Sequence, residues 1–455
     1  ITGYDGQTMY EVTRSLVERG AFAVSPEFNT LPGPDGRDYS RYGLGLSLVA
    51  AIPYAAARPF AFASSHANEV LEAAVSCTMA FVVAALVVAL YLLARRIDAR
   101  AGAALLVAAG GVAGTYMLPY SKEFFSEPLA ALCLVMAMER ILGRHAGAAG
   151  FALGAAVLVR PQSLLFAPVL LTVAWWQQGL GSSIRAAAAA APGILAAVAY
   201  NVVRFGRPLS FGYEDVGFTT PLLNGLGGLL FEPTKSVLLF APICLLLPFA
   251  LWSLWQCNRP ALVLIAGNFG ITLGVVAMWF AWHGGWCWGP RLLLPGLAPT
   301  IASVGPWLVR PNRWRATALL FTLGFLVSLP AMLVPTQAQQ LERPRIPQQV
   351  LREGHFMRTQ PLASPYAWRQ LQLLVPTVRY SIEHRYKGLD DGRNYLRYLS
   401  LWQVGATRKL QRAGLLVSLM GTLLLFLLVV FTGHKVRAGL VDIRRLDRPS
   451  PGSPD

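Results

Sequence analysis

Residues 69–94 read EVLEAAVSCTMAFVVAALVVALYLLA, and Arg95 and Arg96 follow at once. The stretch is mostly apolar and exceeds the roughly 20 residues that a helix needs to cross a bilayer. We therefore predict that it spans a membrane as a helix. The two arginines at its end then help to decide which side of the membrane each loop occupies.

The composition places the whole chain in the membrane class. Of its 455 residues, 55% are hydrophobic and only 14% are charged, whereas a soluble domain carries about 25% charged residues. The mean hydropathy is +0.47. We expect an all-α polytopic membrane protein. The net charge of +16 is interpreted as Lys and Arg gathered in cytoplasmic loops. No nucleic-acid partner is expected, because no basic run is interleaved with aromatic residues on a soluble segment.

Further apolar stretches continue the pattern along the chain. Residues 43–62 are also long enough to span. We predict instead that they lie on the membrane surface, because counting them as a span would move Arg95 and Arg96 to the other side relative to the start of the sequence. The predicted spans are 69–94, 102–120, 127–142, 146–159, 162–177, 186–204, 236–256, 261–282, 291–309, 316–335 and 413–432.

Basic residues fall unequally on the two sides that these spans define. One side receives Arg95, Arg96, Arg100, Arg140, Arg144, Arg185, Arg259, Arg310, Arg313, Arg315 and the basic tail. The opposite short loops receive Lys122, Arg160, Arg204, Arg207, Lys235 and Arg291. The positive-inside rule makes the first side cytoplasmic. The predicted parts are an extracytoplasmic loop with juxtamembrane helices (1–68), a transmembrane bundle (69–335), a small extracytoplasmic domain or cap (336–412), a last span (413–432) and a cytoplasmic basic tail (433–455).

The cysteines and the start of the sequence add two expectations. Neither a disulfide framework nor a zinc site is predicted, because no two cysteines have metal-ligand spacing. The five are Cys77, Cys133, Cys244, Cys257 and Cys287. The sequence opens in a polar loop and not in a signal peptide, so we expect that a segment before Ile1 is missing from this chain.

Asp5 stands at the start of a predicted amphipathic helix that ends near Gly20. Two stripes recur at spacings of three and four, as on a helix that lies on the bilayer surface. The apolar stripe is Met9, Val12 and Leu16, and the polar stripe is Glu11, Arg14 and Glu18. An Asp in this place is either a helix cap, worth roughly 1 kcal/mol, or a functional carboxylate.

Two further clusters of charge fall on the same predicted side. Arg41 lies between Tyr39 and Tyr42 at the start of the surface segment, where its planar fork suits either a bound lipid phosphate or ordinary headgroups. Lys122 and Glu123 lie at a helix junction, just before Glu127 enters the next span. Ionisable residues at membrane depth usually face a cavity. The alternative is a salt-bridged junction.

A third cluster is His283-Gly284-Gly285-Trp286-Cys287-Trp288-Gly289-Pro290-Arg291. Its glycines permit a tight turn, its tryptophans suit a membrane interface, and Arg291 heads an apolar span, where a phosphate is a possible partner. Lys235 and Arg160 are weaker candidates of the same kind. Cations and carboxylates thus converge from separate loops onto one face. A carboxylate beside a lipid phosphate can take a proton from an acceptor hydroxyl, and the cations can stabilise the departing phosphate.

The order of these parts resembles the membrane-embedded GT-C glycosyltransferases, especially the bacterial family 39-like branch related to protein O-mannosyltransferases and lipid A aminoarabinose transferase. In that family a catalytic Asp precedes an amphipathic juxtamembrane helix, a cationic stretch before a second interfacial helix, and a span ending in Leu-Ala-Arg-Arg. This chain has Asp5, residues 10–20, Arg41-Tyr42-Gly43 and Leu93-Ala94-Arg95-Arg96 in that order. Val159-Arg160-Pro161 resembles the family's cation-Gly/Pro corner, and GGWCWGPRLLLP (284–295) is similar to a stretch of bacterial members. The resemblance covers roughly residues 3–180.

The resemblance implies a GT-C-type helix bundle with interfacial helices and assigns roles within it. Asp5 would be the catalytic base. The family's second acid is replaced by Gly6 and a nearby arginine by Thr8, so we expect Asp5 to act either alone or with Glu123 as a catalytic partner, and other cations to bind the donor. The candidate substrate- and phosphate-binding residues are Tyr39, Arg41, Tyr42, Lys122, Arg160, Lys235, His283 and Arg291.

The implied reaction moves a hexosyl or pentosyl group from a polyprenyl-phosphate-linked sugar to an acceptor hydroxyl, with inversion, on the periplasmic or extracellular side of a bacterial inner (plasma) membrane. The acceptor is a protein, a lipid or a cell-envelope glycan. No cofactor is expected, and metal is not expected to be essential, because no carboxylate cluster resembles a metal-binding pair. Two alternatives stay open: a lipid-linked glycan flippase or transporter, and an oligosaccharide ligase or polymerase with a pyrophosphate-linked donor.

Overall fold

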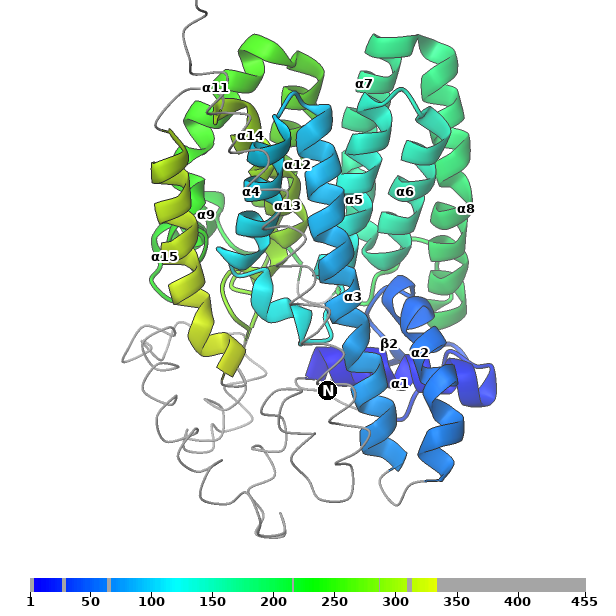
Figure 1. The fold of residues 1–455 in the computed structure, drawn as a ribbon. Helices are drawn as coiled ribbons and strands as arrows, with labels where there is room; N and C mark the ends of the chain where they lie inside the picture. Colours follow the sequence, from blue (N-terminus) through cyan, green and yellow to red (C-terminus); the bar gives the residue numbers. More distant parts are fainter. Residues whose placement is uncertain are drawn as a thin grey trace, which may run out of the picture.

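The computed structural model describes residues 4–26, 30–63, 67–214, 217–285, 287–308 and 313–333. They form a bundle of α-helices with one two-stranded antiparallel hairpin (Figure 1), so the all-α class predicted from the sequence is confirmed. The predicted cap 336–412, last span 413–432 and tail 433–455 lie outside the described residues.

The helices and strands follow one another in three groups, with η marking a 3₁₀ helix. The first is α1 (Tyr4–Arg19), β1 (Thr30–Pro32), β2 (Asp38–Ser40), α2 (Gly45–Phe62) and α3 (Ala67–Arg96). The second is α4 (Ala101–Ala113), η1 (Leu118–Ser121), α5 (Glu127–Leu142), α6 (Ala146–Val159), η2 (Pro161–Phe166), α7 (Ala167–Gln178) and α8 (Leu180–Phe205). The third is α9 (Leu222–Phe231), α10 (Val237–Phe240), η3 (Pro242–Leu246), α11 (Leu247–Cys257), α12 (Arg259–Met278), η4 (Arg291–Leu293), α13 (Leu294–Ile301), α14 (Val304–Trp307) and α15 (Arg313–Leu333).

Five of these helices are long and apolar enough to cross a membrane. They are Gly45–Phe62, Ala67–Arg96, Leu180–Phe205, Arg259–Met278 and Arg313–Met332. Four of them coincide with predicted spans. The fifth, α2, is the segment predicted to lie on the membrane surface, and its relation to the bilayer stays a prediction. The other predicted spans within the described residues correspond either to one shorter helix or to two or three consecutive short helices.

Four predicted spans are not single continuous α-helices, and one of them, 162–177, starts within η2 and continues as α7. The span 236–256 is divided into α10, η3 and α11, and Pro242 is the first residue of η3. The span 291–309 is divided in the same way, with Pro295 and Pro299 inside it. Proline has no backbone N–H to donate and its ring crowds the preceding turn, so these apolar stretches change direction where the sequence pattern alone suggested one helix. The span 102–120 also ends early as an α-helix, at Ala113.

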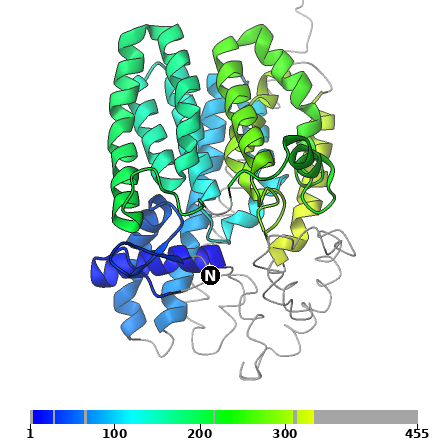
Figure 2. The ribbon, with the colours of Figure 1, turned by 180° about the vertical axis from the view of Figure 1, so that it is seen from behind.

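Helix α1 lies across one end of the bundle, beside α2 and the first turns of α3 (Figures 1 and 2). Met9 and Val12 are 1% and 2% exposed, as the predicted apolar stripe requires. Met9 and Tyr10 pack into a core with Leu46 and Val75 of α2 and α3. The helix begins at Tyr4, so Asp5 lies within its first turn. Apolar burial therefore holds Asp5 at this end of the bundle.

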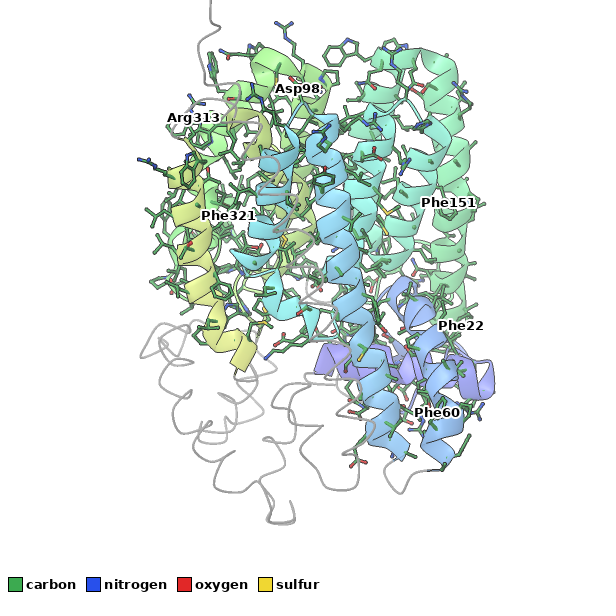
Figure 3. The ribbon with its side chains drawn as sticks, viewed as in Figure 1. Phe22, Phe60, Asp98, Phe151, Arg313 and Phe321 are labelled. Carbon is green, nitrogen blue, oxygen red and sulfur yellow. The ribbon has the colours of Figure 1, made fainter. Side chains whose placement is uncertain are left out.

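Residues labelled in Figure 3 show which end of the bundle α1 crosses. Arg96, at the end of α3, pairs with Glu139 near the end of α5 at 2.9 Å. Asp98 and Arg313 lie at this same end, and Phe22 and Phe60 lie at the opposite one (Figure 3). The opposite end is the one that α1 crosses. Two of the basic residues used to infer sidedness, Arg96 and Arg313, therefore lie at the end of the bundle away from α1.

Helices α6 and α8 pack through small residues with almost no space between their backbones. A Cβ added to Gly150 of α6 would lie 1.9 Å from the carbonyl oxygen of Ala186, and one added to Gly193 of α8 would lie 2.4 Å from the carbonyl carbon of Gly154. Small residues let helices approach closely where dispersion drives packing. This contact positions the end of α6, which carries Arg160.

The close approach gives a test with a matched control in the same helix. Gly150→Ala should lower the free energy of unfolding by about 1–3 kcal/mol, because the added methyl meets backbone that has no room to move. Gly147→Ala should be neutral or slightly stabilising, because nothing lies within 4 Å of its Cβ position and Ala favours a helix more than Gly does. Thermal unfolding in detergent compares the two. Equal stability of both variants would contradict the packing.

Candidate active site

Asp5 and Arg291 meet although they are 286 residues apart in the chain. The Nη2 of Arg291 donates a hydrogen bond to the Oδ2 of Asp5. Arg291 begins η4 directly after the Gly-rich loop, and its guanidinium lies over the ring of Phe125, with Cζ 4.4 Å from the ring centroid. Such a cation–π contact strengthens when water is excluded. The first turn of α1 is thus connected to the start of η4.

Glu127 extends this pair into a network. It is the first residue of α5 and is 1% exposed. Its Oε1 lies 2.7 Å from Nη1 of Arg160 and 3.6 Å from Nε of Arg291. Arg160 also donates to the hydroxyl of Ser126 at 3.1 Å. Two carboxylates and two guanidinium groups therefore alternate across four segments, which offsets the cost of removing each charge from water.

Tyr42 is the second partner of the Asp5 carboxylate. Burial by itself would raise the pKa of Asp5, but Arg291, a hydrogen bond with the Tyr42 hydroxyl, and Arg160 together hold that pKa below its usual value. Burial and the negative charge of Asp5 raise the pKa of Tyr42 well above its usual value. At neutral pH Asp5 is therefore ionised and Tyr42 is a neutral hydrogen-bond donor.

A buried arginine fixes the segment that carries Tyr42. Arg204, near the end of α8, is 1% exposed. Its Nη1 donates to the carbonyl oxygens of Ser40 and Tyr42, at 2.5 and 2.8 Å, and its Nη2 donates to Oδ1 of Asn201 at 2.6 Å. Its guanidinium also lies over the ring of Tyr200, 4.0 Å from Cζ to the centroid. Arg204 therefore acts on the site by holding backbone.

Arg41 differs from the other cations of this end. Its Cζ lies 5.6 Å from the ring centroid of Tyr213, and its Nε is buried with no hydrogen-bond partner in the part of the chain that the structure describes. Burial raises the pKa of Tyr213, and the charge of Asp5 adds to the rise, so this ring lies in the field of the Asp5 network. The neighbouring Tyr39 is used otherwise, since its hydroxyl donates to Oδ2 of Asp35 at 2.9 Å.

Lys235 and His283 shape the loop that leads to Arg291. The amine of Lys235, 2% exposed, donates to the carbonyl oxygens of Gly285 and Cys287, each at 2.8 Å. The Nδ1 of His283 accepts a hydrogen bond from the N–H of Gly285 at 2.9 Å. Gly284 and Gly285 have φ near +72° and +74°, a region that a side chain would strain. Both predicted phosphate ligands are therefore engaged with the loop backbone.

Lys122 and Glu123 lie near the residues that shape this loop. The amine of Lys122 donates to the carbonyl oxygen of Met332 at 2.9 Å. Burial lowers the pKa of Lys122 to about 8, and the charge of Glu123 opposes that fall. Glu123 itself is 2% exposed, and its negative charge also favours the charged form of Lys235. Besides Asp5, the carboxylate that contacts Arg160 and Arg291 is Glu127. Glu127 was noted from the sequence at the same helix junction, but it was assigned no role.

The structure thus brings together Asp5, Tyr42, Arg160 and Arg291 from the predicted set, with Arg41 beside them. Glu127, Tyr213 and Arg204 were not predicted as site residues. Glu127 had a signal, a charge at the entrance to a span. Tyr213 had none, because a tyrosine in a polar loop is ordinary in sequence, and Arg204 was noted only as a basic residue at the end of a predicted span.

An apolar crevice opens next to Arg160. Its walls come from α5, η2, α12 and the start of α13. Lining side chains include Arg160, Gln162, Leu134, Ile271, Val275 and Leu292. The crevice is small, about 50 Å³, and Arg160 borders its mainly apolar walls. Within the described ranges no three His, Cys, Asp or Glu side chains gather as a metal site would need, and the dispensability of metal stays a prediction.

Comparisons with known proteins identify the fold. No protein-family model matches the sequence, and no curated protein matches it. The structure is similar to that of ArnT from Cupriavidus metallidurans, a lipid A aminoarabinose transferase, in the apo state (TM-score 0.50) and bound to undecaprenyl phosphate (TM-score 0.51). In both cases the identity is 12%, and the match covers 89% of this chain and 71% of ArnT.

A third similar structure is the archaeal oligosaccharyltransferase AglB from Archaeoglobus fulgidus, in complex with an inhibitory peptide and a dolichol-phosphate. It matches at a TM-score of 0.41 and 13% identity, over 88% of this chain and 59% of AglB, and no conclusion below depends on it. ArnT is a GT-C superfamily member. The GT-C-type fold expected from the sequence is therefore confirmed.

The role of Arg204 leads to a stability test. Arg204→Met should lower the free energy of unfolding by about 2–4 kcal/mol, because two backbone carbonyls and the Asn201 amide lose a charged donor in a buried place. Arg207→Met, three residues later and exposed, removes the same charge and should change stability by less than about 0.5 kcal/mol. Thermal unfolding of both variants in detergent checks the difference, and similar losses would contradict the assigned clamp.

The buried histidine leads to a pH test. Burial, with the positive charges of Lys235 and Arg291, lowers the pKa of His283 to about 3, against about 6.5 in an unfolded chain. Below pH 6.5 the unfolded state binds a proton that the folded state refuses, so stability falls as the pH is lowered. In His283→Asn, the amide oxygen replaces Nδ1 as acceptor and nothing titrates. Between pH 7 and pH 5 the wild type should lose about 2 kcal/mol more than this variant, measured by thermal unfolding at each pH. Parallel pH profiles would contradict the burial of a neutral His283.

Proposed function

We propose that this protein is a membrane glycosyltransferase that moves a sugar from a polyprenyl-phosphate donor to an acceptor hydroxyl, with Asp5 as general base. The observation that carries the proposal is the meeting of Asp5 with Arg291, Arg160 and Tyr42 at one end of a GT-C-type bundle, beside an apolar crevice. The ArnT structure with undecaprenyl phosphate bound supports a lipid-linked donor.

The chemistry follows from the charges. The Asp5 carboxylate takes the proton of the acceptor hydroxyl as its oxygen attacks the anomeric carbon of the sugar. The bond between that carbon and the phosphate oxygen breaks, and its electron pair leaves with the polyprenyl phosphate. A single displacement of this kind inverts the anomeric configuration. Arginines beside the phosphate stabilise the charge that grows on the leaving group.

Arg41 and Arg160 are the cations we assign to the donor phosphate. Arg41 has no hydrogen bond or ion pair within the described ranges and lies over Tyr213. Arg160 borders the small, mainly apolar crevice. Lys235 and Lys122 are less suitable, because their amines already bond backbone carbonyls. From the predicted set of phosphate ligands we therefore propose Arg41 and Arg160 and not Lys235 or Lys122.

We place the site on the extracytoplasmic face of a bacterial plasma membrane. The support is the separation of Asp5 from the basic end that contains Arg96 and Arg313, since such clusters orient toward the cytoplasm. The acceptor is a protein, a lipid or a cell-envelope glycan, and we propose that residues 336–412 contribute to its selection.

The alternative of a flippase or transporter fits the structure less well. The fully or nearly buried ionisable side chains in the described part of the chain lie at helix ends, as Glu127, Glu139, Arg204 and Lys235 do. A transport path would need such groups through the core. A ligase or polymerase on the same scaffold would take a pyrophosphate-linked donor, so competition between monophosphate and pyrophosphate lipids distinguishes it from the proposed transferase.

The deciding experiment is transfer of a radiolabelled sugar from polyprenyl-phosphate donors to a cell-envelope fraction. Asp5→Asn should reduce transfer by about 10²–10⁴-fold, the usual contribution of a general base, in protein that is less stable but still folded at the assay temperature. Glu11→Gln, with the same charge change in the same helix, should leave transfer within about twofold, because Glu11 pairs with Arg14. No transfer by the wild type from any lipid-phosphate sugar, or full activity in folded Asp5→Asn, would contradict the proposal.

A further inference from the structure

In this structure the proposed base is occupied. Arg291 contacts one oxygen of Asp5, and Tyr42 bonds the same carboxylate. Within the described residues, the charged or titratable groups that face Asp5 include Arg291, Tyr42, Arg160 and Tyr213. A carboxylate that neutralises a guanidinium is a poor proton acceptor, because taking the proton would leave a buried cation unpaired. Something must therefore weaken the contact between Asp5 and Arg291 before Asp5 can act.

Arg291 is built to change partners without leaving the site. Its Nη2 bonds Asp5, while its Nε faces Glu127 at 3.6 Å and its plane lies over Phe125. A guanidinium has five N–H donors in a rigid fork. If the Asp5 contact breaks, the Glu127 and Phe125 contacts still hold the group in place. Glu127 is thus a positioning residue for Arg291.

A phosphate bound at Arg160 would also lie beside Arg291. Both guanidinium groups lie near Oε1 of Glu127. The distance from this oxygen is 2.7 Å to Nη1 of Arg160 and 3.6 Å to Nε of Arg291. Phosphate and carboxylate bind the guanidinium fork in the same way and with similar strength. The anion of the donor would therefore compete with Asp5 for Arg291.

We propose, resting on the proposed function, that Arg291 is a donor-sensing residue that keeps Asp5 engaged until the phosphate of a lipid-linked donor draws Arg291 away. The donor phosphate and the Asp5 carboxylate then compete for the guanidinium of Arg291. By linkage, a phosphate that weakens the contact between Asp5 and Arg291 makes Asp5 more basic, and the charged Asp5 weakens phosphate binding by the same factor. The acceptor hydroxyl meets an active base only when a donor is present.

The proposal predicts that removing the catalytic charge strengthens donor binding. We would measure the Kd of undecaprenyl phosphate for the purified full chain in nanodiscs, with thermal unfolding as the check on folding. Asp5→Asn should bind on the order of tenfold more tightly than the wild type. In the Arg291→Gln background the same Asp5→Asn change should alter Kd by less than about twofold, because the residue that connects the two anions is absent. Glu11→Gln should leave Kd unchanged in both backgrounds.

Two results would overturn the inference. One is an Asp5→Asn variant that binds undecaprenyl phosphate no more tightly than the wild type. The other is tightening that persists with Arg291→Gln, since a general field effect of the lost charge does not need that arginine. If the folded wild type binds no undecaprenyl phosphate, the proposed donor itself fails and the inference fails with it. Binding without coupling through Arg291 leaves the proposed function intact and removes only the sensing role.

Discussion

Charge pairing away from water is the constraint on which one end of this protein depends. Asp5, Arg291, Glu127 and Arg160 alternate in sign and come from α1, η4, α5 and the corner after α6. A buried charge that loses its partner costs several kcal/mol, so each of these segments is held in position by the others. The network therefore fixes where α1 docks on the bundle, and it places the carboxylate we assign as base among the cations that a lipid phosphate would need.

The cations around this network divide into two kinds by what they bind. Lys235 and Arg204 donate to backbone carbonyls of the loops that present Arg291 and Tyr42. Such bonds satisfy buried carbonyl oxygens and fix irregular backbone, which is tolerated at membrane depth only where protein surrounds it. Arg41 lies on an aromatic ring and bonds no described residue. A positive residue near the site is thus not in itself a ligand for phosphate, because many of its neighbours are carbonyl oxygens that need a donor.

Proline accompanies each charged residue that the bundle itself contributes to the network. Pro128 follows Glu127 at the start of α5, Pro161 follows Arg160 and opens η2, and Pro290 precedes Arg291. Proline fixes the backbone and ends or starts a helix at a set residue. A side chain next to it is therefore held at the helix end. This explains how residues at three separate helix ends converge with little freedom to move along their helices.

The sequence by itself determined the class of fold and most of the helices, since hydropathy and periodicity are local properties of the chain. The choice of Asp5 as base came from the order of parts that resembles the GT-C family, and the roles of Asp5, Arg41, Arg160 and Arg291 stay predictions. The sequence could not distinguish Glu123 from Glu127, because both are glutamates at the same predicted helix junction. It also could not show that Lys235 and His283 hydrogen-bond to the loop before Arg291, because the sequence does not show which backbone groups these side chains meet. Tyr213 gave no signal at all, and Arg204 was noted only as a basic residue at the end of a predicted span. Only the tertiary structure decided these points, because which partner a buried charge meets depends on contacts across as many as 286 residues, and no local pattern encodes such a contact.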